Sequence, residues 1–184
     1  MNVTEQLRAE HEGILTMLQV LERISQQMSS GKPANLGHLE QIIEFLQVFA
    51  DKCHHGKEED ILFPALEKAG IPREGGPIGV MLSDHSRGRN YIRAMREALE
   101  ELKKTEGGTD EFVRAARGYI ELLRGHIEKE NNVLFVMGER NLSQEEQTRL
   151  FDQFEKMEQE KIGTGKHEAF HKMIDELSGV YLSN

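Results

Sequence analysis

The sequence predicts an all-α fold, an antiparallel up-down four-helix bundle followed by extra C-terminal helices. Four long stretches repeat apolar residues every three or four positions, which is the pattern of a helix that buries one face. Short segments containing Gly or Pro separate these stretches, and short connections favour antiparallel neighbours. No stretch alternates apolar and polar residues as a strand does. The 184 residues are therefore expected to form one bundle with an appendage.

The charge and the first residues of the chain limit its partners and its compartment. A net charge of −9 argues against nucleic acid as a partner, because phosphate binding needs a basic face. No apolar run approaches the length of a membrane span, and the N-terminus lacks the basic and apolar regions of a signal peptide. A single cysteine, Cys53, allows no internal disulfide, so we expect a cytoplasmic protein.

The first two helices are predicted over residues 4–28 and 36–68. Asn2 and Glu5 can cap the first helix reciprocally, and Pro64 predicts a kink or a local break in the second. The predicted buried faces carry Leu7, His11, Ile14, Leu18 and Leu21 in the first helix, and Ile43, Leu46, Ala50, His54, Glu58, Ile61 and Ala65 in the second.

Two overlapping pairs of residues compete for the buried face of the second helix. Each pair has a four-residue spacing, which places both of its members on one face of a helix. His54 and Glu58 fall among apolar residues, whereas the face of His55 and Glu59 carries two further charged residues. We therefore predict that His54 and Glu58 are buried and that His55 is solvated.

The third and fourth helices are predicted over about residues 77–104 and 109–137. Gly88 follows His85 by one turn, so it either makes room beside whatever His85 binds or allows a close helix contact. The predicted buried faces carry Met81, His85, Gly88, Ile92, Met95, Leu99 and Leu102 in the third helix, and Phe112, Ala116, Tyr119, Leu123, His126, Glu130, Val133 and Met137 in the fourth.

Two shorter helices are predicted after the bundle. Ser143 and Glu146 form a capping box for a fifth helix that extends to about residue 161. A last helix carries His167, Phe170, Ile174, Leu177 and Tyr181 on one face. We therefore divide the chain into a bundle, residues 1–140, and a helical extension packed on it, residues 141–184.

One motif occurs twice at corresponding places in the bundle. The segment HHGKEEDILFP at 54–64 and the segment HIEKENNVLF at 126–135 both contain His-x-x-x-Glu before an apolar run. A lone histidine precedes each copy by a similar distance, His11 before the first and His85 before the second. Four histidines and two carboxylates thus fall on the buried faces of four different helices.

A metal centre explains this burial of polar groups, because an unpaired carboxylate in a protein core is costly. Mixed imidazole and carboxylate ligands suit iron, manganese or zinc. Two six-coordinate ions that share Glu58 and Glu130 as bridging ligands use the set best, and they leave about four of twelve positions open. Open positions at reduced iron predict dioxygen, nitric oxide or peroxide as the small partner.

The chain resembles the hemerythrin-like HHE cation-binding family over about residues 5–137. The family pattern H…HxxxE…H…HxxxE matches His11, His54–Glu58, His85 and His126–Glu130. The segments KEEDILFP and ENNVLF also resemble the family's sequences at these places. The resemblance implies a four-helix bundle that holds a non-haem, oxo-bridged di-iron centre of two iron ions.

A second resemblance concerns the phrase GPIGVMLSDH at residues 76–85. It is similar to the C-terminal domain of bacterial iron–sulfur-cluster repair di-iron proteins. The sequence contains no match to the cysteine-bearing N-terminal domain of those proteins, which argues against transferring the repair role directly.

One departure from the family pattern concerns the third helix. Oxygen-carrying hemerythrins place a second histidine four residues after the third-helix ligand, where this chain has Arg89. His167 is the candidate substitute for this histidine. Alternatively, His167 is a capped or core histidine. One iron then keeps an open coordination position, which favours sensing or peroxide chemistry over reversible oxygen carriage. The predicted metal ligands are His11, His54, Glu58, His85, His126, Glu130 and His167.

These observations favour a non-haem di-iron protein that binds or senses dioxygen or nitric oxide, or handles iron under oxidative stress. The alternative is a di-iron redox enzyme that processes peroxide or nitric oxide, or donates iron in iron–sulfur-cluster repair. A third hypothesis, a helical scaffold that keeps a metal for stability, is disfavoured by the buried carboxylates. The sequence decides neither between the first two nor on the oligomeric state.

Overall fold

The computed structural model describes residues 2–105, 107–161, 163 and 165–183. Within these ranges the chain is helical and contains no strand, so the predicted all-α class is confirmed. The helices, with π-helical segments marked η, are α1 Val3–Ser29, α2 Leu36–Phe45, η1 Leu46–His55, η2 Glu58–Leu62, α3 Phe63–Lys68, α4 Pro77–Lys104, α5 Thr109–Lys129, η3 Glu130–Leu134, α6 Phe135–Asn141, α7 Gln144–Lys161 and α8 Lys166–Tyr181.

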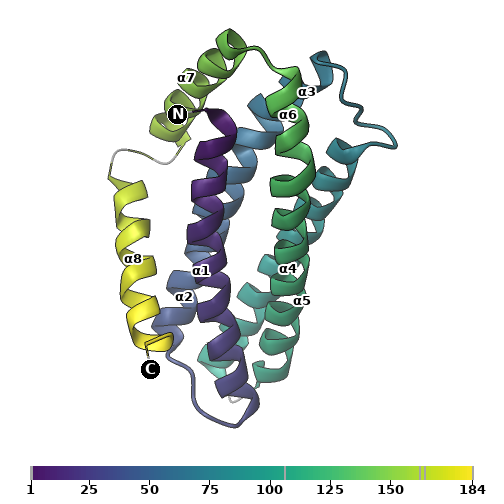
Figure 1. Cartoon of the computed structure of the whole chain (residues 1–184). Helices are drawn as coiled ribbons and strands as arrows, with labels where there is room; N and C mark the ends of the chain where they lie inside the picture. The colour runs from purple at the N-terminus through teal and green to yellow at the C-terminus, as the bar shows by residue number, and fades with distance from the viewer. Residues whose placement is uncertain (1, 106, 162, 164, 184) are drawn as a thin grey trace.

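Four antiparallel rods form the bundle (Figure 1). They are α1, the run from α2 to α3, α4, and the run from α5 to α6. Helix α5 packs between α1 and α4, while α2 packs against α4, which closes the bundle. Helix α7 lies against α1, η1 and η2, and α8 lies beside α1 and α2. None of the described helices combines the length and the apolar character needed to cross a membrane.

The predicted capping boxes are confirmed at two helix starts. The backbone N–H of Asn2 donates to the Glu5 carboxylate at 2.8 Å, and the Asn2 side chain accepts from the N–H of Thr4 at 2.8 Å. The backbone N–H of Ser143 donates to Glu146 at 2.8 Å, and the Ser143 hydroxyl accepts from the N–H of Glu146 at 3.3 Å. These bonds satisfy backbone donors that have no partner inside the helix.

The three π-helical segments coincide with the two copies of the repeated motif. Segment η1 ends at His55, η2 begins at Glu58, and η3 begins at Glu130. Because a π-helix forms i→i+5 hydrogen bonds, its turns are wider than those of an α-helix, and such segments often occur at functional sites. The kink or local break expected at Pro64 is not seen as an interruption: η2 ends at Leu62, α3 begins at Phe63, and both residues have helical backbone angles.

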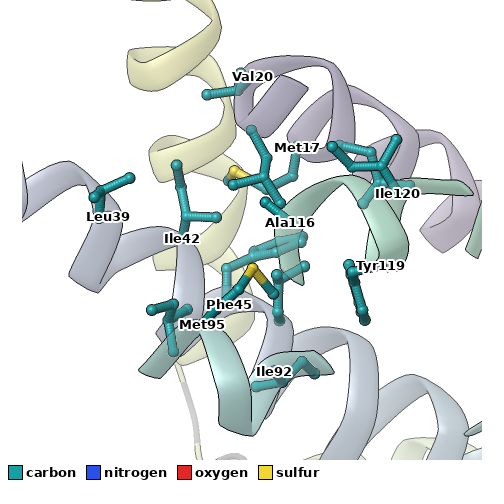
Figure 2. Packing of buried hydrophobic residues seen from close by; sticks show 14 of the residues in the cluster. Met17, Val20, Leu39, Ile42, Phe45, Ile92, Met95, Ala116, Tyr119 and Ile120 are labelled. Carbon is teal, nitrogen blue, oxygen red and sulfur yellow. The ribbon is translucent and has the colours of Figure 1, made fainter. Parts of the chain in front are cut away.

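Two apolar clusters fill the bundle and leave a polar layer between them. The larger cluster includes Met17, Val20, Leu39, Ile42, Phe45, Ile92, Met95, Ala116, Tyr119 and Ile120 (Figure 2). The smaller cluster includes Leu7, Leu62, Phe63, Met81, Leu134 and Phe135. On α1, His11 lies between Leu7 of the smaller cluster and Ile14 of the larger one. Apolar packing on both sides holds the polar layer in place and keeps water from it.

Gly88 of α4 faces α5. A Cβ atom at this position would lie 3.6 Å from the Tyr119 ring of α5. This is an ordinary van der Waals distance, so the contact with α5 would tolerate a Cβ and does not by itself require glycine.

Candidate metal centre

Seven buried side chains converge in the polar layer. They form two groups in which the possible ligand atoms lie within 4.8 Å of one another. One group comprises His55, Glu58, His85 and His126, and the other comprises His11, His54, Glu58 and Glu130. Glu58 belongs to both groups, so a single carboxylate joins two potential ion positions.

Each of the two glutamates faces a histidine of both groups. The Glu58 oxygens lie 3.5 Å from Nε2 of His54 and 3.4 Å from Nε2 of His85. The Glu130 oxygens lie 3.3 Å from Nε2 of His126 and 3.2 Å from Nε2 of His11. Both carboxylates therefore have the orientation of bridging ligands.

The seven residues of the two groups are called the cage here, and their unpaired atoms show that they fit metal ions. Within the described parts of the chain, both oxygens of Glu58 and Glu130 and the Nε2 atoms of His11 and His54 are buried without a hydrogen bond. Buried polar atoms normally have partners, and orphaned ones are costly. Two ligand atoms about 2.1 Å from one ion lie about 3 Å apart at a right angle, close to the distances seen here. The donor set suits two divalent transition-metal ions.

His55 corrects one of the sequence predictions. It was expected to be solvated, but it is 3% exposed and its ring stacks on His85 with centroids 3.8 Å apart. The prediction was wrong because it assumed α-helical geometry throughout, whereas η1 is π-helical up to His55. The wider turn lets both His54 and His55 face the cage.

The histidines of the cage are held from behind through Nδ1. Nδ1 of His54 lies 2.8 Å from Glu10, that of His85 lies 2.7 Å from Glu59, and that of His11 lies 3.0 Å from Asn131. Metal-binding histidines usually donate this second N–H to a carboxylate or carbonyl oxygen, which fixes the tautomer and leaves Nε2 free as a ligand. His126 has a longer contact of 3.6 Å to Asp84.

Arg89 supports the site from outside. Its guanidinium donates to Asp51 at 2.8 Å and to Glu59 at 2.6 Å. Asp51 lies 3.3 Å from Nδ1 of His55, and Glu59 contacts His85. The residue that departs from the family pattern thus holds the two carboxylates that contact His55 and His85.

The same three residues mark the side on which the cage approaches solvent. Asp51, Glu59 and Arg89 line a surface pocket of about 380 Å³ together with Lys52, Gly56, Asp60 and Lys161. Behind His54, Glu10 is covered by Lys57, which is 0% exposed and donates to Glu10 at 2.6 Å.

The pKa values describe how the charges balance without an ion. Burial disfavours the charged form of His85, but its contacts with the carboxylates of Glu58 and Glu59 outweigh this effect and raise its pKa to about 9. Burial also acts to raise the pKa of Glu130, but the charges of His126 and His11 lower it to about 2. A proton on His85 thus offsets part of the negative charge around it, and a bound metal ion would replace that proton.

His167 is placed away from the cage, in contrast to its prediction as a ligand of that centre. It belongs to neither group of ligand atoms and is half-buried beside Phe49. Its Nδ1 contacts Glu158 and its Nε2 lies 2.8 Å from Nε2 of His171. The physical reason is that the Nδ1 of His167 contacts Glu158 and its ring packs against Phe49, outside the polar layer, while His55 joins the group of Glu58, His85 and His126.

Sequence reasoning missed the residues behind the ligands as well as His55. The doubled histidine at 54–55 was the available signal for His55. Glu10, adjacent to His11, and Glu59, adjacent to Glu58, were visible only as charged neighbours of ligands. Their role follows from the packing of separate helices, which sequence periodicity does not report.

The comparisons with known proteins agree with this geometry. The family model described as hemerythrin HHE cation binding domain matches residues 2–137. The chain is 28% identical to the iron-sulfur cluster repair protein YtfE of Edwardsiella ictaluri over 128 residues, covering 68% of this chain and 58% of that protein. It is 31% identical to the YtfE of Yersinia pseudotuberculosis over 85 residues, covering 45% of this chain and 38% of that protein. The chain thus spans less than two thirds of these curated relatives. No solved structure matches significantly.

Proposed function

The chain belongs to the hemerythrin HHE cation-binding domain family, and from this premise we propose that its cage holds two non-haem iron ions as an oxo-bridged centre. One observation carries the proposal: Glu58 is shared by two groups of ligand atoms, and Glu130 also faces a histidine of each. A structural zinc site would need only four ligands and usually includes cysteine. Here seven imidazole and carboxylate side chains converge.

The ligand count leaves room for chemistry at the centre. His55, His85 and His126 would hold one ion, His11 and His54 the other, and Glu58 and Glu130 would bridge them. Five imidazoles and two bridging carboxylates fill nine of twelve octahedral positions, so about three remain open. The ions, when bound, would supply reversible redox change and open positions for small ligands.

The protein's own residues set the conditions of that chemistry. Glu10, Glu59 and Asn131 accept the Nδ1 protons of their histidines, which keeps each Nε2 lone pair directed into the cage. The apolar clusters on both sides exclude water from the site.

We propose that the protein binds or senses a small diatomic ligand, dioxygen or nitric oxide. Alternatively, within the same proposal, the protein handles iron under oxidative stress. The buried, ligand-rich and partly open cage supports this class of function. A cytoplasmic location is part of the proposal, supported by the single, buried Cys53.

The second candidate is a redox or repair activity, namely peroxide or nitric oxide processing or iron donation to iron–sulfur clusters. The observation that favours it is the similarity of the chain to the iron-sulfur cluster repair proteins YtfE. The cage suits it as well, because carboxylate-bridged iron near a surface pocket can be released more readily than iron in a closed thiolate site.

Three assays on one iron-loaded preparation separate these functions. Reversible spectral change on adding and removing dioxygen or nitric oxide supports binding or sensing. Repeated turnover of hydrogen peroxide supports the redox enzyme, and recovery of activity in a cluster-depleted iron–sulfur protein supports iron donation. Absence of all three responses, with iron bound, would contradict both candidates and favour a structural role for the metal.

A further inference from the structure

A second histidine pair lies outside the cage, on α8. His167 and His171 are four residues apart, and their Nε2 atoms face each other at 2.8 Å. The rings lie side by side with centroids 4.7 Å apart and planes inclined by 26°. Histidines at this spacing on one helix face can bind a single metal ion.

The separation of the two nitrogens fits a shared ion. Two imidazole nitrogens about 2.1 Å from one ion lie about 3 Å apart when they occupy adjacent positions. Inside the cage, Nε2 of His85 and Nε2 of His126 are 3.2 Å apart. The outer pair therefore has a nitrogen separation similar to that of two cage histidines, although its rings are inclined by 26° and those of the cage pair by 66°.

His167 is also supported from behind in the manner of the cage histidines. Its Nδ1 contacts the carboxylate of Glu158, as Nδ1 of His54 contacts Glu10. Glu158 is in turn held by Lys57, which donates to it at 2.7 Å. A carboxylate on Nδ1 orients the ring and strengthens Nε2 as a ligand, so this is a built arrangement.

The surroundings keep the pair rigid and open. Phe49 packs edge-on against both rings, at 5.4 Å from His167 and 6.3 Å from His171. His171 is exposed, so water can complete the coordination of an ion. Two imidazoles plus water suit a divalent transition-metal ion such as zinc or iron(II), and do not suit calcium or magnesium.

From these observations we propose that His167 and His171 form an additional binding site for a divalent transition-metal ion, separate from the cage. The site binds more weakly than the cage because it offers two protein ligands. It gives His167 a metal-binding role, though at another site than the one predicted from the sequence.

The test uses the full chain with its cage filled with iron, dialysed against zinc, with both metals counted by elemental analysis. The wild-type chain should bind one more zinc ion than the His171→Ala variant, while the iron content of the two stays equal. Since His171 is exposed, this variant is expected to fold. His38→Ala, at another histidine near α8 that contacts Tyr181, is the matched control and should retain the extra zinc.

A second variant tests the role of Glu158. Glu158→Gln should weaken zinc binding at this site about 10- to 100-fold. The proposal would be overturned if the wild-type chain bound no zinc beyond the cage, or if His171→Ala bound as much as wild type. Loss of iron with retention of the extra zinc would contradict the proposed cage instead, so the two failures are distinct.

Discussion

The ammonium group of Lys57 is completely buried and donates to the Glu10 carboxylate at 2.6 Å. Glu10 in turn contacts Nδ1 of His54, a proposed ligand, at 2.8 Å, while Lys57 also donates to Glu158 of α7 at 2.7 Å. Burial opposes the charge on Glu10, but His54 and Lys57 lower its pKa below the usual value. The lysine thus links a cage ligand to the C-terminal helices.

Replacing this lysine should be strongly destabilising. Lys57→Met keeps much of the side-chain volume but leaves the Glu10 carboxylate buried without its cation. Breaking a buried ion pair by removing one partner costs about 3–5 kcal/mol. Unfolding by urea should show a loss of this size, whereas Lys52→Met, at an exposed lysine of the same segment, should change the free energy of unfolding by less than about 0.5 kcal/mol. Equal effects of the two substitutions would refute the linking role.

His55 should prove as necessary for metal binding as His54. His55→Ala removes one of three imidazoles from its group, so the ion on that side loses affinity and the iron content should fall from two per chain towards one. His38→Ala is the control, because His38 lies on α2 and belongs to neither group. If His55→Ala retains two irons and a wild-type spectrum, His55 is not a ligand.

The helix pattern of the sequence was a sufficient guide to the fold and to most of the cage. His11, Glu58 and Glu130 were placed correctly in the interior because apolar residues three and four positions away define the buried face of an α-helix. The capping residues Asn2 and Ser143 located helix starts, since their side chains satisfy local backbone groups.

The errors arose where the chain leaves α-helical geometry or where separate helices meet. His55 was misplaced because no sequence pattern distinguishes the π-helical turns of η1 from α-helical ones. Arg89 was interpreted only as a missing ligand, although it bonds to Asp51 and Glu59 from other segments. Such contacts depend on the packing of the helices around one another, which a periodicity along one helix does not contain.

Glu59, whose carboxylate contacts Nδ1 of His85, tests whether a residue that is not itself a proposed ligand strengthens metal binding. Glu59→Gln removes the charge that contacts Nδ1 of His85, and loss of such a partner typically weakens metal binding about 10- to 100-fold. Asp60→Asn removes an equal charge from the next residue, which faces Lys161 instead. Competition with a chelator should show the weakening in Glu59→Gln only. Equal weakening in both variants would indicate a general charge effect.

Removal of the metal should destabilise the protein without unfolding it. The two apolar clusters persist without ions, but Glu58 and Glu130 remain buried at 0% exposure with only imidazoles as partners. A ligand at 1,000 times its dissociation constant stabilises the native state by about 4 kcal/mol, so chelation should lower the thermal midpoint by several degrees.

Hydrogen exchange locates this effect in the chain. After metal removal, amide hydrogen exchange should accelerate most in η1, η2 and η3, and adding the metal back should restore the protection of these amides. An unchanged midpoint and unchanged exchange after complete metal removal would mean that the cage does not bind the ions.

The most direct test of the account is the iron content of the aerobically purified protein together with its optical spectrum, compared between wild type and Glu58→Ala. We predict two irons per wild-type chain, with near-ultraviolet charge-transfer bands. In the Glu58→Ala variant, the charge-transfer bands and the bridged pair of irons should be lost. One zinc per chain, one iron, or a Glu58→Ala variant that keeps two irons and the same spectrum would contradict a di-iron centre bridged by Glu58.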